Sequence, residues 1–140
     1  MPRKFFDQKL RDLNKEMADV GAVVDGRIAM TIDALRTMDS ELAAEVVAGD
    51  NQINHSEQQI EQVCMNLLAL QQPIATDLRV IAACLKIITD MERVADQCAD
   101  ICDIITTGEM RLNSAPLAHV IQMLEAARAM FDRAMDVFLS

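Results

Sequence analysis

Apolar residues recur at every third or fourth position through most of this chain, the spacing expected of amphipathic α-helices. The first run extends over residues 5–48 and predicts a helix of about 43 residues, roughly 65 Å long. Gly49 is a suitable end for it, and Asp50 or Asn51 could cap the next helix. The apolar residues of the run are Phe6, Leu10, Leu13, Met17, Val20, Val24, Ile28, Ile32, Leu35, Met38, Leu42 and Val46.

The same pattern predicts a second helix over residues 51–72 and a third that follows Pro73. Proline rarely lies beyond the first turn of a helix, so Pro73 separates the two. The third helix starts at Thr76 or Asp77 and meets no glycine or proline before Gly108, a length of about nine turns. Its apolar residues cover most of its circumference, so we expect it to be the central helix of the fold.

A fourth helix is expected after a linker over residues 108–115, with Ser114 as its cap and Pro116 in its first turn. No stop signal follows, so the chain is expected to end within this helix. Short connections make consecutive helices antiparallel neighbours. The predicted fold is therefore all-α: an antiparallel three-helix bundle plus a fourth helix, in a closed four-helix bundle or an oligomeric, swapped arrangement.

The amino-acid composition agrees with an all-α fold and argues against some classes of function. The chain has no Trp or Tyr, only four Gly and ten Met, as expected of helices rather than strands. Its net charge of −9 argues against a nucleic-acid ligand. No apolar stretch approaches the roughly 20 residues of a membrane span, and no signal peptide is evident, so we expect a cytoplasmic protein.

The four cysteines lie within helical patterns and contain no CxxC pair. We interpret Cys64, Cys84, Cys98 and Cys102 as reduced core thiols. A soft-metal role for Cys98 and Cys102, one turn apart, is weakened by the absence of a nearby histidine.

Glu92 is the most informative anomaly, because it falls on an apolar face of the third helix. Asp96 lies one turn further along nearly the same face. Carboxylates that face a core need a partner, since an unpaired buried charge costs several kcal/mol or becomes neutral. Ion pairs with Arg93 or Lys86 are one explanation, and a bound cation is the other.

Two segments carry a resemblance to a known family. The segment PIATDLRVIAACLKIITDMERVAD, residues 73–96, is similar to the most specific motif of the PhoU family, the accessory proteins of bacterial phosphate uptake. The segment MDSELAAEVVAGDNQIN, residues 38–54, resembles the family's acidic turn. The departures are small: the family has glycine where Ala95 stands and asparagine where Asp100 stands.

The resemblance implies a domain organisation and a role. Residues 1–108 would form one complete PhoU-like three-helix repeat, and residues 109–140 the linker and first helix of an incomplete second repeat. The implied role is non-enzymatic: linking the phosphate ABC transporter ATPase to a two-component sensor kinase and repressing the phosphate-starvation response. The uncovered face of the fourth helix adds the expectation of a homo-oligomer.

The resemblance also implies a metal site, because some PhoU-like proteins bind metal through paired acidic-x-x-x-acidic motifs. Here the motifs map onto Glu92 and Asp96 with Asp100, and onto Asp50 with Asn54. Oxygen ligands suit hard ions such as iron, manganese, magnesium or calcium.

Other candidate sites are weaker. Asp77 with Arg79 could mark a phosphate or partner contact, or a helix-start charge beside a surface residue. His55 and His119 lack the Glu-x-x-His context of di-iron enzymes. A metal-dependent carboxylate enzyme, a metal store and a plain helical scaffold remain the alternative functions.

Overall fold

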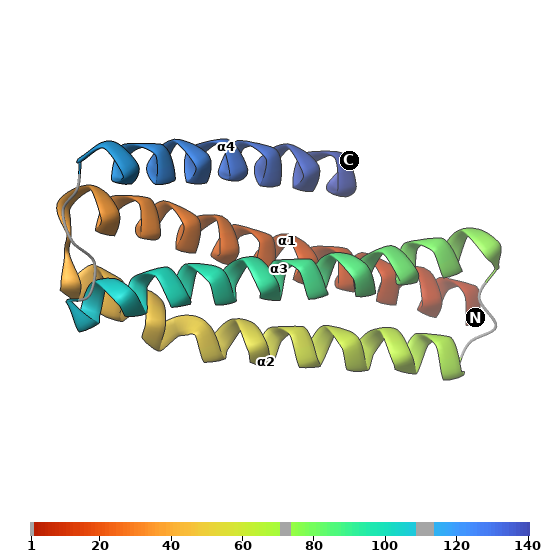
Figure 1. The fold of residues 1–140 in the computed structure, drawn as a ribbon. Helices are drawn as coiled ribbons and strands as arrows, with labels where there is room; N and C mark the ends of the chain where they lie inside the picture. The colour runs from red at the N-terminus through yellow and green to blue at the C-terminus, as the bar shows by residue number, and fades with distance from the viewer. Residues whose placement is uncertain (1, 71–73, 109–113) are drawn as a thin grey trace.

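The computed structural model describes residues 2–70, 74–108 and 114–140, and this part of the chain folds into four helices (Figure 1). They are α1 (Pro2–Thr37), α2 (Ser40–Leu70), α3 (Ala75–Thr107) and α4 (Ser114–Leu139). Within the described residues the all-α prediction is confirmed. The predicted separator Pro73 and most of the predicted linker over 108–115 lie outside the described residues.

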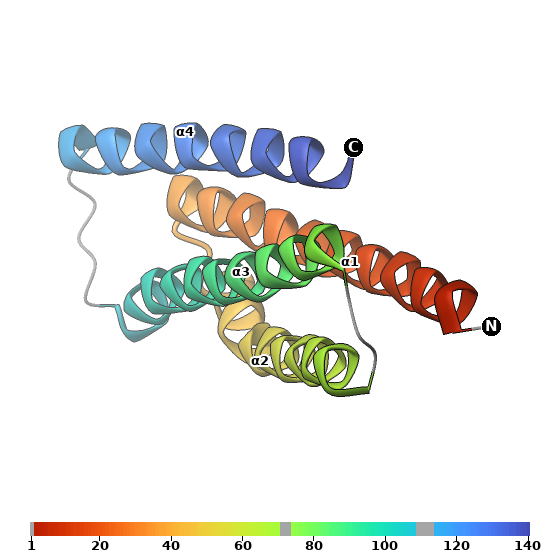
Figure 2. The ribbon, with the colours of Figure 1, turned by 90° about the vertical axis from the view of Figure 1, so that its right-hand side faces the viewer.

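The first three helices form an antiparallel bundle. α1 and α3 run in one direction and α2 runs in the opposite direction, and each of the three packs against the other two. α4 lies outside this bundle, antiparallel to α1 and alongside it, as Figure 2 shows from a second direction. The predicted architecture of a three-helix bundle with a fourth helix is confirmed.

The boundary between the first two helices was predicted wrongly. α1 ends at Thr37, and the turn is made by Met38 and Asp39, so Gly49 and Asp50 lie inside α2. Met38 adopts a left-handed conformation (φ 52°), and the amide of Asp39 donates to the carbonyl of Ala34 at 3.0 Å. This is a Schellman ending, in which Met38 takes the place that glycine usually fills. The pattern of apolar residues continues across the turn and so conceals it.

Asp39 then starts α2. Its Oδ1 accepts hydrogen bonds from the amides of Glu41 and Leu42, both at 3.1 Å. A short acidic side chain at this position satisfies two of the amides that a helix start leaves without partners.

The ends of α3 agree more closely with the prediction. The helix begins at Ala75, with Ile74 as its extended N-cap residue. At its other end Gly108 has φ 73°, and its amide donates to the carbonyl of Ile105. The left-handed conformation is the reason for a glycine there, and the predicted stop at Gly108 is confirmed.

The central helix is α1, and the expectation that the third helix is central was wrong. α1 packs against α2, α3 and α4, whereas α3 packs along α1 and α2. Gly21 allows the close approach of α4, because a Cβ atom there would lie 2.8 Å from the Cε of Met135 and 3.6 Å from that of Met91. α4 therefore comes close to the backbone of α1 at Gly21.

The interior is apolar and holds the cysteines as predicted. All four are buried free thiols, and burial raises the pKa of Cys64 to about 12 and that of Cys84 to about 11. Thiols held protonated in this way are poor nucleophiles and poor metal ligands. None of the helices in the described ranges is long and apolar enough to cross a membrane.

Candidate functional site

Acidic side chains line the neighbouring faces of α2 and α3. On α2 they recur at helical spacing, and on α3 they are one turn apart, so that each set lies along one side of its helix. Since α2 and α3 pack against each other, the two sets lie close together. We call these acids, together with the amide of Asn54 on α2, the carboxylate cluster: Asp50, Glu57 and Glu61 of α2, with Glu92, Asp96 and Asp100 of α3.

Asp96 is the residue that connects the two halves of the cluster. It interacts with Glu92 on its own helix and with Asp50 on α2. Hydrogen bonding with Asp96, partial burial and the charges of Asp96, Glu57 and Asp50 raise the pKa of Glu92 to about 7. Glu92 is therefore readily protonated near neutral pH.

The pKa of Asp50 is raised as well. Burial, hydrogen bonding with Asp96 and the charges of Asp96 and Asp100 raise its pKa to about 6. Moreover, the Oδ1 atoms of Asp50 and Asn54 are buried without a hydrogen-bond partner among the described residues. Such atoms are costly unless a proton, a water molecule or a cation satisfies them.

The cluster includes two carboxylates that the sequence reasoning missed, Glu57 and Glu61. Burial and the neighbouring Glu61 raise the pKa of Glu57, with a further contribution from the charge of Asp96. Their spacing of three and seven residues from Asn54 was a usable signal. The candidate site on this helix was taken from the family-like segment, which ends at Asn54, so the two glutamates beyond it were not included.

The ion pair proposed from sequence for Lys86 involves a different residue. Lys86 Nζ lies 2.9 Å from Asp90 Oδ1 on an exposed side of α3, and Arg93 is exposed. An exposed pair one turn apart contributes only a few tenths of a kcal/mol. In the described structure this lysine therefore neutralises Asp90 and not Glu92.

The cluster fits a hard cation in its chemistry, although its side chains do not surround a common point. Among the described residues no group of three or more His, Cys, Asp or Glu side chains is arranged to hold a metal ion. The donor atoms are all oxygens, two of them buried without partners, as a magnesium, calcium or manganese ion would require. An ion would be held only after these side chains reorient, so the metal site stays a prediction.

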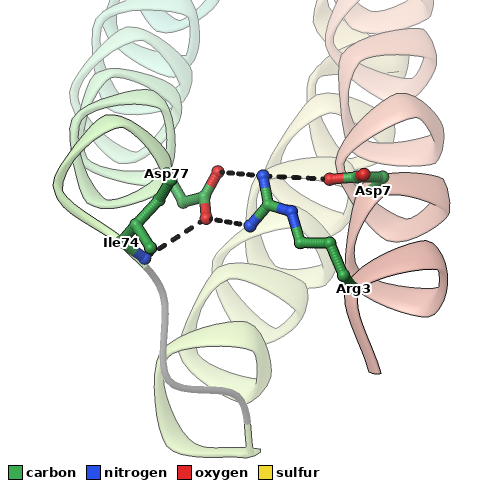
Figure 3. Close-up of polar contacts among 4 residues, drawn as sticks. All are labelled: Arg3, Asp7, Ile74 and Asp77. Atoms are coloured by element: carbon green, nitrogen blue, oxygen red, sulfur yellow. Dashed lines mark hydrogen bonds and ion pairs between the residues drawn. The ribbon is translucent and has the colours of Figure 1, made fainter. Parts of the chain in front are cut away.

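Asp77 has a structural partner at the other end of the bundle. Arg3 of α1 donates to both its carboxylate oxygens, at 2.6 and 3.3 Å, and the amide of Ile74 donates to Asp77 Oδ2 at 3.3 Å (Figure 3). The bond from Arg3 lowers the pKa of Asp77. Asp77 thus caps α3 and ties it to α1, which supports the helix-start interpretation, while Arg79 is exposed.

A second polar region lies between α1 and α4. Arg128 donates to both oxygens of Asp25, at 2.9 and 3.1 Å, and Arg36 is paired with Glu125. Arg36, Glu125 and Arg128 border a cavity of about 370 Å³. Because every charged group named here has a partner across the interface, we interpret the region as the attachment of α4.

Comparison with known proteins matches the part of the chain that holds the carboxylate cluster. A family model described as "PhoU domain" matches residues 17–105, a range that begins in α1 and ends in α3. The PhoU phosphate-specific transport system accessory protein of Serratia marcescens is 34% identical over 97 residues, which are 69% of this chain and 40% of that protein. The PhoU homolog of Clostridium acetobutylicum is 29% identical over 140 residues, 99% of this chain and 64% of that protein.

A solved structure shows the same arrangement. The crystal structure of PhoU from Pseudomonas aeruginosa matches with a TM-score of 0.89 and 29% identity, over 95% of this chain and 64% of that one. The chain thus spans less than two thirds of the length of these relatives.

Proposed function

This chain belongs to the PhoU domain family, and from that premise we propose that it acts as an accessory protein of bacterial phosphate transport. The observation that carries the proposal is the family match over residues 17–105, which holds the carboxylate cluster and most of the three-helix bundle. Relatives with this domain are named phosphate-specific transport system accessory proteins.

In this proposal the protein works in the cytoplasm by contact and not by catalysis, linking the transporter ATPase to the sensor kinase and repressing the phosphate-starvation response. Long helices that pack against one another supply a rigid contact surface. Three apolar side chains are exposed where Arg3 meets Asp77: Phe5 (53%), Ile74 (58%) and Leu78 (44%). Exposed apolar residues gathered at one place are typical of protein contacts.

The test is co-purification of the full chain with the transporter ATPase and, separately, with the kinase sensor domain. We expect Phe5→Ser with Leu78→Ser to weaken capture at least tenfold. Ile104→Ser is the matched control, since Ile104 is 40% exposed near the opposite end of α3. If the wild-type chain captures neither partner, the linking role is wrong.

We propose further that the carboxylate cluster binds a hard metal ion, held by Asp50, Asn54, Glu92 and Asp96 with Asp100 beside them. The support is the pair of buried oxygens without partners among the described residues. The raised pKa values agree with it: burial is the main cause for Asp50 and hydrogen bonding with Asp96 for Glu92, with neighbouring negative charges adding to both. A bound ion would supply positive charge that neutralises these carboxylates and ties α2 to α3. Iron, manganese, magnesium and calcium all accept oxygen ligands.

Elemental analysis of the purified protein beside the Glu92→Ala/Asp96→Ala variant tests the site. Stoichiometric metal that is lost in the variant supports it, whereas metal-free protein that binds no added divalent ion contradicts it. The same samples address the alternative of a metal-dependent enzyme or a metal store, because hydrolase activity or several ions per chain would favour that class.

We also propose that the chain forms homo-oligomers through the outer side of α4. Met123, Met130 and Val137 recur every seven residues there and are 71, 73 and 70% exposed. Seven-residue spacing of apolar side chains is the pattern by which one helix packs against another. An uncovered row of this kind favours association with a further helix.

A further inference from the structure

Exposed basic residues gather at one end of the three-helix bundle, although the chain as a whole carries a net charge of −9. Six exposed lysines and arginines take part in no ion pair among the described residues. Four of the six lie near the start of α1 or of α3, and these two helices begin at the same end of the bundle (Figure 1). We call these four the basic end: Lys4, Lys9, Arg11 and Arg79.

The same end exposes apolar side chains beside the cations. Phe5, Ile74 and Leu78 are exposed there. Lys9 Nζ lies 5.3 Å from the centre of the Phe5 ring, and Arg79 directly follows Leu78 in the chain. Apolar groups bordered by charged ones are the usual composition of a protein contact surface, in which the centre is apolar and the rim is polar.

The charges at this end form a mixed pattern that internal contacts hold in place. Arg3 Nη2 lies 3.1 Å from Asp7 Oδ1 (Figure 3). Gln8 connects two further charged groups, because its Oε1 accepts from Arg11 at 2.8 Å and its Nε2 donates to Asp12 at 2.9 Å. A folded partner can match such a pattern group by group, whereas attraction to an anionic bilayer depends mainly on excess positive charge. The pattern therefore favours a protein partner.

We propose that the basic end docks on an acidic surface of a partner protein, with Phe5 and Leu78 at the centre of the contact. This names the chemistry of the contact in the linking role proposed above, and it rests on that role. An acidic partner repels most of a chain with a net charge of −9 and attracts only this end. The distribution of charge thus sets the orientation of docking as well as its rate.

The salt dependence of association with the transporter ATPase and with the kinase sensor domain tests the sign of the charge on the partner. For the protein that binds, the association rate of the full wild-type chain should fall about tenfold between about 50 and about 500 mM salt, because salt screens attraction between unlike charges. Two acidic proteins that met through other surfaces would associate faster as salt increases. A rate that rises with salt, or does not change, would overturn the proposal.

Charge reversal tests the place of the contact. Lys9→Glu with Arg79→Glu should slow association about tenfold at about 50 mM salt, and the difference from wild type should shrink at about 500 mM. Lys9→Arg with Arg79→Lys keeps both charges and should stay within about twofold of wild type.

Arg93→Glu with Arg133→Glu is the matched control for this reversal. It reverses the two exposed cations that also lack an ion-pair partner among the described residues but lie away from the basic end. It should change the association rate less than about twofold. Equal slowing by the two reversals would show that only total charge matters, and would overturn the site. Urea midpoints of both variants establish that they are folded.

The remaining outcomes separate this contact from the linking role. If wild type captures neither protein, the linking role is wrong and the contact falls with it. If a protein is captured and the reversal at Lys9 and Arg79 changes nothing, the linking role stands and the basic end is not its contact.

Sedimentation with phosphatidylglycerol vesicles, beside phosphatidylcholine vesicles, tests a bilayer as the occupant. Wild type should remain in the supernatant with both. Binding to the anionic vesicles that the Lys9→Glu/Arg79→Glu variant loses, with unchanged association with the protein partner, would assign the basic end to a membrane surface and overturn the acidic protein partner.

Discussion

Arg128 of α4 donates two hydrogen bonds to the carboxylate of Asp25 in α1, across 103 residues of sequence. The pair is partly shielded from solvent, with side chains 40 and 29% exposed. A bidentate guanidinium–carboxylate pair fixes orientation as well as distance. It therefore sets the position of α4 along α1, next to the apolar contact of Met135.

Replacing this arginine should loosen α4 selectively. We expect Arg128→Ala to cost about 1 kcal/mol, between an exposed pair and a buried one. Hydrogen exchange should show faster exchange in α4 and little change in α2 and α3. Arg133→Ala, an exposed arginine of the same helix, is the control. Equal effects of the two substitutions would show that the Asp25 pair does not position α4.

Substitution of two glycines of α1 should change the free energy of unfolding in opposite directions. At Gly21 a leucine side chain would need the space of Met135, so Gly21→Leu should displace α4 and cost about 2 kcal/mol or more. At Gly26 nothing lies within 4 Å of the place a Cβ atom would take, so Gly26→Ala should gain about 0.5–1 kcal/mol from helix propensity. Urea unfolding measures both, and a stabilised Gly21→Leu protein would contradict the packing of α4.

The break between α1 and α2 depends on the cap at Asp39. Asp39→Ala removes the acceptor for two amides and should cost about 1 kcal/mol of unfolding free energy. Asp33→Ala, an exposed aspartate inside α1, serves as the comparison, with a smaller expected effect. If the two substitutions cost the same, the helix boundary at Met38 and Asp39 is in doubt.

The carboxylate cluster should make the metal-free protein less stable as pH rises. The folded pKa values of Glu92, about 7, and Asp50, about 6, lie above their ordinary values near 4. Between roughly pH 4 and 7 the folded state therefore binds more protons than the unfolded state, so the free energy of unfolding falls as pH increases.

Urea midpoints at pH 4.5 and 7.5, in chelator and low salt, measure this dependence. We expect Glu92→Gln to flatten it and Glu41→Gln, at the exposed start of α2, to leave it unchanged. Lowered pKa values at Asp25 and Asp77 act in the opposite direction, but only at more acidic pH. If the urea midpoint of wild type rises with pH over this interval, ionisation of the carboxylate cluster does not destabilise the folded state and the prediction is wrong.

The outer side of α4 should govern self-association. Its exposed apolar row consists of Val120, Met123, Ala127, Met130, Ala134 and Val137. Met123→Glu with Met130→Glu places two charges within this row and should convert an oligomer to a monomer in light scattering. Gln8→Glu with Gln62→Glu adds the same charge on α1 and α2 and should leave the mass unchanged. A wild-type chain that is monomeric at high concentration would overturn the oligomer.

The sequence alone determined the features that depend on the local spacing of apolar residues. Apolar residues at every third or fourth position predicted an all-helical bundle, and Gly108 marked the end of α3, because helix formation and termination depend on residues within a few turns. The same periodicity exposed Glu92 and Asp96 as acidic residues on an apolar face. Family motifs then added Asp50 and Asn54 to the candidate site.

Tertiary structure decided everything that depends on which distant residues meet. Met38 takes a left-handed conformation that its own side chain does not signal, so the helix boundary appeared at Gly49 instead. Gly49 lies against the guanidinium of Arg27, which is on another helix. The place of α4 on α1, and so the identity of the central helix, follows from the fit of Met135 against Gly21 and from the Arg128–Asp25 pair. Such contacts join residues far apart in the chain, where helical spacing carries no information.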